Sequence, residues 1–254
     1  MNITFLGTGT SQGVPIIGCS CEVCISDSPK DKRLRASVFL EWEGAKVVID
    51  TGPDFRYQML RSNKTDLDAV FYTHEHKDHI AGLDDIRPIN FLHKKKIEVY
   101  ATDIVSEALK REFHYIFAEK KYPGVPQIEL VNIQNKPFKF KGKEIIPVEG
   151  LHYKLPVLGF RIDSFCYITD MNYISEEEKS KMRNLDVLVL NALRRESHIS
   201  HFTLDEALDL VKELNPKEAY FTHISHQLGK HDIVSKELPE NVFLAYDNLK
   251  LDII

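Results

Sequence analysis

A short segment that follows an apolar run carries four side chains of the kinds that bind metal ions. Its sequence is Thr73-His74-Glu75-His76-Lys77-Asp78-His79. Three imidazoles and one carboxylate so close together cannot all reach one ion in comfortable geometry, but they can serve two. We therefore expect His74 and His76 to face one ion, and Asp78 and His79 to face a second. Imidazole and carboxylate ligands suit zinc, manganese or iron, so the residue types leave the metal open. The alternative is a polar, histidine-rich surface turn, which this spacing after a strand disfavours.

Three further ligand-type side chains stand where later strands are expected to end: His152, Asp170 and His223. The strands that precede them are predicted at Glu144–Glu149, Phe165–Thr169 and Glu218–Thr222. Any one of the three side chains alone would be an ordinary surface or core residue. Because four strands each deliver a metal-type side chain at the same end, we expect one dinuclear site along an edge of a β-sandwich.

Two metal ions in such a site would favour hydrolysis. Ions about 3.5–4 Å apart can share a water, lower its pKa and hold hydroxide at neutral pH. The charge of two divalent ions exceeds that of Asp78, Asp170 and hydroxide together, so an anionic substrate such as a phosphodiester is favoured. Carbonyl hydrolases use the same kind of centre. The ligands therefore predict a hydrolase but leave its substrate open.

Three of the four cysteines crowd into the pattern Cys19-x-Cys21-x-x-Cys24. In a reducing compartment such crowding indicates metal binding rather than disulfides. The spacing is typical of a zinc site that lacks one ligand, which His226 or His231 could supply. A closed site with four ligands would fasten a loop and leave no open position for catalysis. The alternative is three free thiols in a loop.

The order of predicted elements is that of a β-sandwich covered by helices, an α/β arrangement. The remaining strands are predicted at Asn2–Leu6, Ser37–Trp42, Lys46–Asp50, Asp68–Thr73, Lys96–Ala101, Gln127–Ile133, Leu158–Ile162, Val187–Asn191 and Asn241–Ala245, with a hairpin turn at Glu43-Gly44. Helices are predicted at Val105–Phe117, Ser175–Arg183 and Thr203–Leu214. The last of these begins with a capping box of Thr203 and Glu206.

The composition is that of an ordinary globular protein, with 254 residues of which 43% are hydrophobic and 28% charged. The sequence has no Pro/Gly/Ser-rich linker, low-complexity tract or repeat, so we expect one domain over residues 1–254 with a cysteine loop at 19–24. The formal net charge of -5 disfavours binding to long stretches of nucleic acid. Neither a secretory leader nor the roughly 18 apolar residues of a spanning helix are present, so we expect a cytoplasmic protein that does not bind membranes.

Together these features resemble the metallo-β-lactamase superfamily. The pattern His-x-His-x-Asp-His is complete in residues 74–79, and a strand that ends in Asp-x-Gly matches Asp50-Thr51-Gly52. The resemblance implies an αββα sandwich of two mixed sheets flanked by helices, with the metal site at one edge. It also implies that Asp170 bridges both ions and that Asp50 orients a ligand histidine.

The cysteine pattern narrows the resemblance to the phosphoribosyl cyclic phosphodiesterases of the phosphonate carbon–phosphorus lyase pathway. That branch carries a similar cysteine site, completed by a histidine just after the last active-site histidine. The resemblance therefore implies a structural zinc on Cys19, Cys21, Cys24 and His226. The branch also carries a histidine before a helix, at the place of His201 in this chain.

A leaving alkoxide needs a proton unless a metal takes it, and His201 precedes a predicted helix between the Asp170 and His223 motifs. We expect His201 to act as general acid or to contact the phosphate. One alternative is a histidine that faces solvent at the helix start. A second is that His198, close by, has the role instead.

The resulting hypothesis is a phosphodiesterase with two catalytic zinc, manganese or iron ions and one structural zinc. Its substrate would be a small cyclic or nucleotide-like phosphodiester, hydrolysed by a metal-bridged hydroxide with Asp78 and His201 as the catalytic residues. The sequence leaves the oligomeric state open, and a homodimer is one possibility because members of the superfamily often dimerise.

Four rival functions share parts of this pattern. A transfer-RNA 3′-processing endonuclease would carry a protruding basic arm, which the mixed charge between Ile80 and Leu151 disfavours. A non-catalytic carrier that resembles the pyrroloquinoline-quinone biosynthesis protein is disfavoured by the complete ligand set. A glyoxalase-like thioester hydrolase would lack the cysteine pattern, and a secreted β-lactamase would carry a signal peptide.

Overall fold

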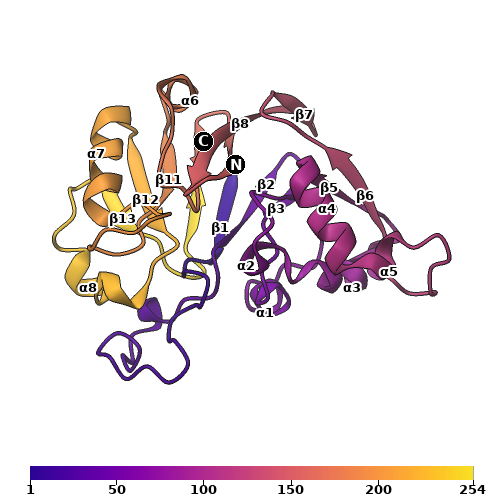
Figure 1. Ribbon diagram of the computed structural model, residues 1–254, viewed down its shortest axis with the longest axis horizontal. Helices are drawn as coiled ribbons and strands as arrows, with labels where there is room; N and C mark the ends of the chain where they lie inside the picture. The colour runs from indigo at the N-terminus through magenta and orange to yellow at the C-terminus, as the bar shows by residue number, and fades with distance from the viewer. Residues whose placement is uncertain (254) are drawn as a thin grey trace.

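Two β-sheets pack face to face, with helices on the outer side of each sheet (Figure 1). This computed structural model describes residues 1–253. Each sheet has seven strands and contains both parallel and antiparallel neighbours. The predicted αββα sandwich is confirmed. The single domain over residues 1–254 stays a prediction, and its last residue, Ile254, lies outside the described residues.

The strands of the first sheet lie in the order β14-β1-β2-β3-β4-β5-β6. They are β1 (Asn2–Gly7), β2 (Ser37–Trp42), β3 (Ala45–Ile49), β4 (Ala69–Phe71), β5 (Ile97–Ala101), β6 (Ile128–Asn132) and β14 (Lys250–Asp252). Pairing is antiparallel from β14 to β3 and parallel from β3 to β6. Because parallel strands end at the same edge, the residues after β3 and β4, Asp50 and His74 among them, come close together.

The strands of the second sheet lie in the order β13-β12-β11-β10-β9-β8-β7. They are β7 (Phe138–Phe140), β8 (Lys143–His152), β9 (Leu155–Ile162), β10 (Phe165–Tyr167), β11 (Val187–Asn191), β12 (Glu218–Thr222) and β13 (Val242–Leu244). Pairing is antiparallel from β7 to β10 and parallel from β10 to β13. The carboxyl ends of β10 and β12 therefore also meet at one edge.

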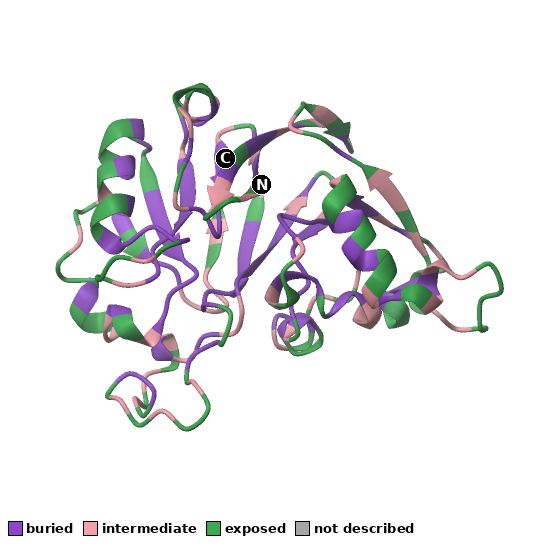
Figure 2. Ribbon diagram, in the orientation of Figure 1, coloured by how far each residue is buried: buried purple, intermediate pink, exposed green. Residues whose placement is uncertain are grey.

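Both faces of each sheet are buried, which explains why many strands are apolar throughout. In β3, Val47 and Ile49 belong to the core between the sheets, whereas Val48 packs toward the helices outside. Figure 2 shows the helices buried on the side that faces a sheet and exposed on the other. The helices are α1 (Phe55–Arg61), α2 (Lys77–Ile80), α3 (Arg87–His93), α4 (Asp103–Glu112), α5 (His114–Phe117), α6 (Glu176–Ser180), α7 (Leu204–Leu214) and α8 (His231–Val234), with short 3₁₀ turns at Pro29–Asp31, Leu83–Ile86 and His226–Leu228.

Most predicted elements are present, with two kinds of exception. The predicted helix Val105–Phe117 is wrong as one element, because the backbone leaves helical geometry at Phe113 and α4 and α5 form separately. The strands β7 and β14 and the helices α1, α2, α3 and α8 were not predicted. The Glu43-Gly44 turn and the capping box of α7 are confirmed. None of the helices in residues 1–253 is long and apolar enough to span a membrane.

Candidate metal centre

The seven ligand-type side chains predicted from the sequence lie together at one edge of the two sheets. Together with His201 they form three overlapping clusters, in each of which one ligand atom per residue lies within 4.8 Å of the others. The clusters are His74, His76 and His152; Asp78, His79, Asp170 and His223; and His152, Asp170 and His201. Because His152 and Asp170 each belong to two clusters, the three clusters form one continuous site.

Three side chains at this edge leave their strands on a left-handed backbone. The angle φ is 64° at Asp50, 58° at Asp170 and 55° at His223. An L-residue in this region costs on the order of 1 kcal/mol. The strain is tolerated because β3, β10 and β12 are each paired on both sides within a sheet. Strain of this kind gathers where a site requires particular side-chain directions.

Asp50 is fully buried and orients two of the histidines. Its Oδ1 accepts a hydrogen bond from the Thr73 amide (2.9 Å), and its Oδ2 accepts bonds from the Thr73 hydroxyl (2.8 Å) and from His79 Nδ1 (2.7 Å). Since the Thr73 hydroxyl donates to Asp50, it accepts from His74 Nδ1 at 2.9 Å. The hydrogen bonds at Nδ1 direct Nε2 of both imidazoles into the site, where it can offer a lone pair to a bound metal ion.

The buried nitrogens of the site fit metal ions better than they fit the protein alone. His152 donates from Nδ1 to the Ser200 carbonyl at 2.9 Å, which leaves its Nε2 for the site. The buried Nε2 atoms of His74 and His223 have no hydrogen-bond partner within residues 1–253. Each such atom costs on the order of 1–3 kcal/mol unless something binds it. Imidazole nitrogens that converge with carboxylates are a donor set for divalent zinc, manganese or iron.

The carboxylates and imidazoles of the second cluster perturb one another strongly. His79 Nε2 lies 3.1 Å from Asp78 Oδ2 and 3.2 Å from Asp170 Oδ2. Burial lowers the pKa of His79, but Asp78, Asp170 and Asp50 outweigh burial and raise that pKa well above its usual value. Burial raises the pKa of Asp170, yet the neighbouring imidazoles hold it well below its usual range. The buried carboxylates thus stay ionised and require positive charge beside them.

Residues 45–224 match the β-lactamase superfamily domain. The chain belongs to the β-lactamase superfamily. The crystal structure of a diphosphatase from the PhnP family superposes on this chain with a TM-score of 0.93 at 41% sequence identity, and covers 100% of this chain and 98% of that one. The resemblance to metallo-β-lactamase hydrolases is thereby confirmed, and this fold implies divalent metal ions.

Proteins with names other than diphosphatase are also similar to this chain. An octanoyltransferase of Porphyromonas gingivalis is 37% identical over 253 residues, which are 98% of this chain and 51% of the relative. A ribonuclease Z of Prochlorococcus marinus is 27% identical over 168 residues, which are 64% of this chain and 49% of the relative. This superfamily member thus spans about half the length of these curated relatives. Zn²⁺-bound PqqB from Methylobacterium extorquens, at 19% identity and a TM-score of 0.80 over both full chains, shares the fold.

His201 lies inside the site rather than at the surface. The residue is only 8% exposed, so the alternative of a histidine that faces solvent is wrong. Its ring centroid lies 4.6 Å from that of His152 and 4.9 Å from that of His223, and its Nδ1 has no hydrogen-bond partner in the described chain. Burial, and then His223, lower the pKa of His201 to about 3. His198 packs behind His201 at 4.9 Å and is more exposed.

The cysteine loop gathers around His226 and not around His231. His226 Nδ1 lies 3.2 Å from Cys21 Sγ and 3.5 Å from Cys19 Sγ, and Cys24 completes the cluster. The hydrogen bond from His226 is the largest of the effects that lower the pKa of Cys21 to about 6, which favours a thiolate. His231 Nδ1 instead lies 3.1 Å from a guanidinium nitrogen of Arg33. Of the two histidines left open by the sequence, only His226 is placed to join the thiols.

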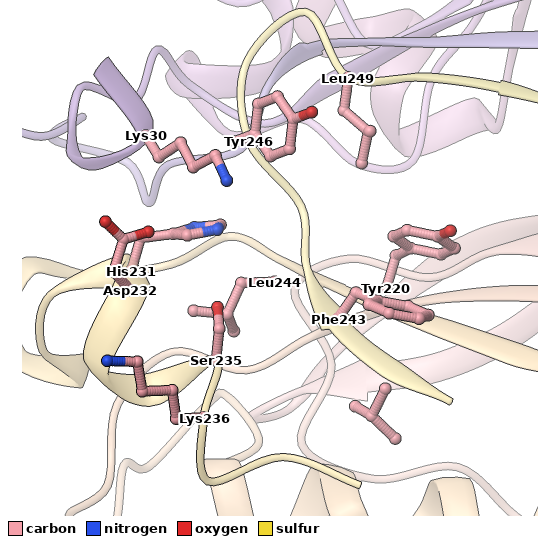
Figure 3. A pocket seen from close by; sticks show the side chains of 11 residues that line it. Lys30, Tyr220, His231, Asp232, Ser235, Lys236, Phe243, Leu244, Tyr246 and Leu249 are labelled. Atoms are coloured by element: carbon pink, nitrogen blue, oxygen red, sulfur yellow. The ribbon is translucent and has the colours of Figure 1, made fainter. Parts of the chain in front are cut away.

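A cavity of about 560 Å³ lies away from the histidine clusters. Figure 3 shows Lys30, His231 and Lys236 toward one end of it and Tyr220 and Phe243 toward the other. None of the seven predicted ligands lines this cavity. Volume alone therefore does not locate the reactive site, because the groups able to do chemistry are elsewhere.

Two residues of the site were not anticipated from the sequence. Thr73 links Asp50 to His74, and Ser200 orients His152 through its carbonyl. Thr73 directly precedes the histidine segment, so its position was a usable signal. The contact of Ser200 joins residues 48 positions apart and had no signal in the sequence.

Proposed function

We propose that this superfamily member is a dinuclear, metal-dependent phosphodiesterase that hydrolyses a small cyclic or nucleotide-like phosphodiester. The observation that carries the proposal is the convergence of seven ligand-type side chains, two of which have buried Nε2 atoms without a hydrogen-bond partner within residues 1–253. The likeness to a diphosphatase supports a substrate that contains phosphorus. A site rich in imidazole and open to divalent cations also favours an anionic substrate.

The clusters divide naturally between two cations and a shared ligand. His74, His76 and His152 would hold one, Asp78, His79 and His223 would hold the other, and Asp170 would be shared. When bound, two such ions polarise the phosphate and lower the pKa of a water to near neutrality. The ionised carboxylates of Asp78 and Asp170 retain the cations, and Asp50 keeps His79 in the tautomer that can bind one.

His201 would act on the substrate. Its buried ring lies against His152 and His223, and its Nδ1 is 3.8 Å from Asp170 Oδ1. From there it can donate a hydrogen bond to a phosphate oxygen, or a proton to the departing alkoxide. An anion beside the ring favours its protonated form and opposes the effect of burial.

The cysteine cluster would hold a structural zinc. Three thiolates and the His226 imidazole make up a closed tetrahedral set with no position left for substrate. His226 follows His223 by three residues, and the Ile224 amide between them donates to the Thr8 carbonyl at 2.9 Å. A zinc there would fasten the segment that carries His223.

The experiment that tests the proposal measures bound metal and the hydrolysis of bis(p-nitrophenyl) phosphate. The proteins are the wild type, Asp78→Ala, and the control Asp205→Ala, which alters an exposed carboxylate in the first turn of α7. We expect about three metals per chain in the wild type and the control, and loss of turnover in Asp78→Ala. A single cysteine-bound zinc, and no hydrolysis after manganese or zinc is added, would refute the proposal and favour a carrier.

The ribonuclease Z relatives favour one second candidate, the processing of transfer-RNA precursors. The net charge of -5 argues against it. Cleavage of a transfer-RNA precursor in preference to small diesters, with binding that weakens steeply as salt rises, would establish that candidate instead.

A further inference from the structure

An open groove of about 540 Å³ begins at the proposed metal ligands and leads to solvent. It is lined by His76, His152, Tyr153, Lys154, Leu155, Ile199 and Ser200. Two of these are proposed ligands, so a substrate whose phosphate sits at the metals must extend past the others. The outer walls of the groove therefore contact the part of the substrate that does not react.

Tyr153 stands at the tip of a tight hairpin, in a conformation that its residue type disfavours. His152 of β8 pairs with Leu155 of β9, so the turn consists of Tyr153 and Lys154 alone. The angle φ at Tyr153 is 59°, a region that favours glycine or asparagine over a bulky aromatic residue. The Tyr153 amide donates to Asn172 Oδ1 at 2.7 Å, which holds the turn in place.

Burial does not explain an aromatic residue at this position. Tyr153 is 49% exposed, and Ile199, on the loop that precedes α7, is 66% exposed. Both walls are anchored to His152: Tyr153 follows it in the chain, and Ile199 adjoins Ser200, whose carbonyl accepts from His152 Nδ1. An aromatic and an aliphatic side chain thus line one groove at positions fixed by a proposed metal ligand.

A cation lies over the aromatic side chain. Lys154 Nζ is 5.2 Å from the centre of the Tyr153 ring, and it forms no salt bridge within residues 1–253. An ammonium group without an anionic partner at the mouth of a groove attracts negative charge. The groove thus combines a surface for a flat ring with a binding group for an additional anion.

We propose that this groove holds the planar base of a nucleotide, stacked on Tyr153 and in contact with Ile199, with Lys154 beside a non-reacting phosphate. The inference rests on the proposed function and narrows its substrate class to nucleotide-containing phosphodiesters, as opposed to sugar cyclic phosphates without a base. Stacking of a base on an aromatic side chain accepts every base, because each has a flat face. Binding of the base then explains why an exposed tyrosine occupies a strained position in this turn.

Isothermal titration of the metal-loaded protein with two probes tests this. Adenosine 5′-monophosphate and ribose 5-phosphate carry the same phosphate group, and only the first has a base. In the wild type we expect adenosine 5′-monophosphate to bind about ten-fold more tightly. Tyr153→Ala removes this preference and leaves the affinity for ribose 5-phosphate within about two-fold, whereas Tyr153→Phe keeps the preference. The matched control Tyr122→Ala, at a tyrosine that is 80% exposed and does not line the groove, leaves both affinities unchanged.

Three results would overturn the inference: equal affinity of the wild type for the two probes, a preference that survives Tyr153→Ala, or no binding of adenosine 5′-monophosphate. Thermal unfolding of each variant shows whether the turn still folds. Failure of the proposed function is recognised separately. Hydrolysis of bis(p-nitrophenyl) phosphate without a preference for the base refutes only the base site, and a Tyr153-dependent preference without hydrolysis refutes only the reaction.

Discussion

Replacement of Asp50 by asparagine tests how the metal ligands are held. The two side chains have the same shape, but asparagine has an NH₂ donor where aspartate has a second oxygen acceptor. The Thr73 amide can only donate, so the asparagine oxygen must take the place of Oδ1. Its NH₂ group then takes the place of Oδ2, which now lies 2.7 Å from His79 Nδ1. Faced with a donor, His79 must present a lone pair on Nδ1 and carry its proton on Nε2.

A proton on His79 Nε2 occupies the position that a metal ion needs. Loss of such an orienting partner weakens metal binding by about 10–100-fold, or about 1.4–2.8 kcal/mol at one site. We expect Asp50→Asn to retain about two metals per chain after gel filtration where the wild type retains about three. The ion lost is the one assigned to the cluster of Asp78, His79 and His223.

The assay is elemental analysis combined with a metal titration of the apoprotein, alongside thermal unfolding. Asp247→Asn is the matched control, because the side chain of Asp247 is also buried and accepts bonds from the Thr8 hydroxyl and the Leu34 amide, but belongs to none of the clusters. The control should lose stability and keep its metals. Unchanged metal content and affinity in a folded Asp50→Asn protein would refute the tautomer argument.

Three further changes have distinct expected outcomes. Cys21→Ser should remove one zinc and lower the melting temperature while both other ions stay bound, as elemental analysis and thermal unfolding would show; unchanged zinc content would count against the structural site. His201→Gln should keep its metals and lower kcat for bis(p-nitrophenyl) phosphate about 100-fold or more, and full turnover would exclude a role in proton transfer. Asp66 contributes to stability against acid: although burial raises its pKa, Lys95 is the foremost of the groups that lower it to about 2. Because the pKa of Asp66 is lower in the folded state, its ionised form stabilises the fold above pH 4, and this stabilisation is lost as the pH falls toward 2. In urea unfolding, Asp66→Asn should therefore lower the free energy of unfolding by about 1 kcal/mol at pH 7 and by much less near pH 2. An equal loss at both pH values would contradict this.

Local pattern was sufficient for the elements that carry the site. The strands β2, β11 and β12 match their predicted bounds, because buried strands read as short apolar runs between turn residues. The capping box predicted the start of α7, since its hydrogen bonds lie within four consecutive residues. The strands β8 and β9 were predicted too short, and their hairpin was not predicted, since Tyr153-Lys154 is not a sequence typical of tight turns.

The sequence by itself determined which residues could bind metal, because ligand chemistry belongs to side-chain type and the segment 74–79 places four such groups within reach of one another. It also supplied the His-x-His-x-Asp-His and Asp-x-Gly patterns on which the resemblance to the superfamily rests. Only the tertiary structure decided how segments distant in the chain meet. It placed His226 rather than His231 beside the thiols, buried His201 between two other histidines, and put an exposed tyrosine beside His152. These contacts depend on how the two sheets pack and on which strands end at the same edge, and a one-dimensional pattern contains neither.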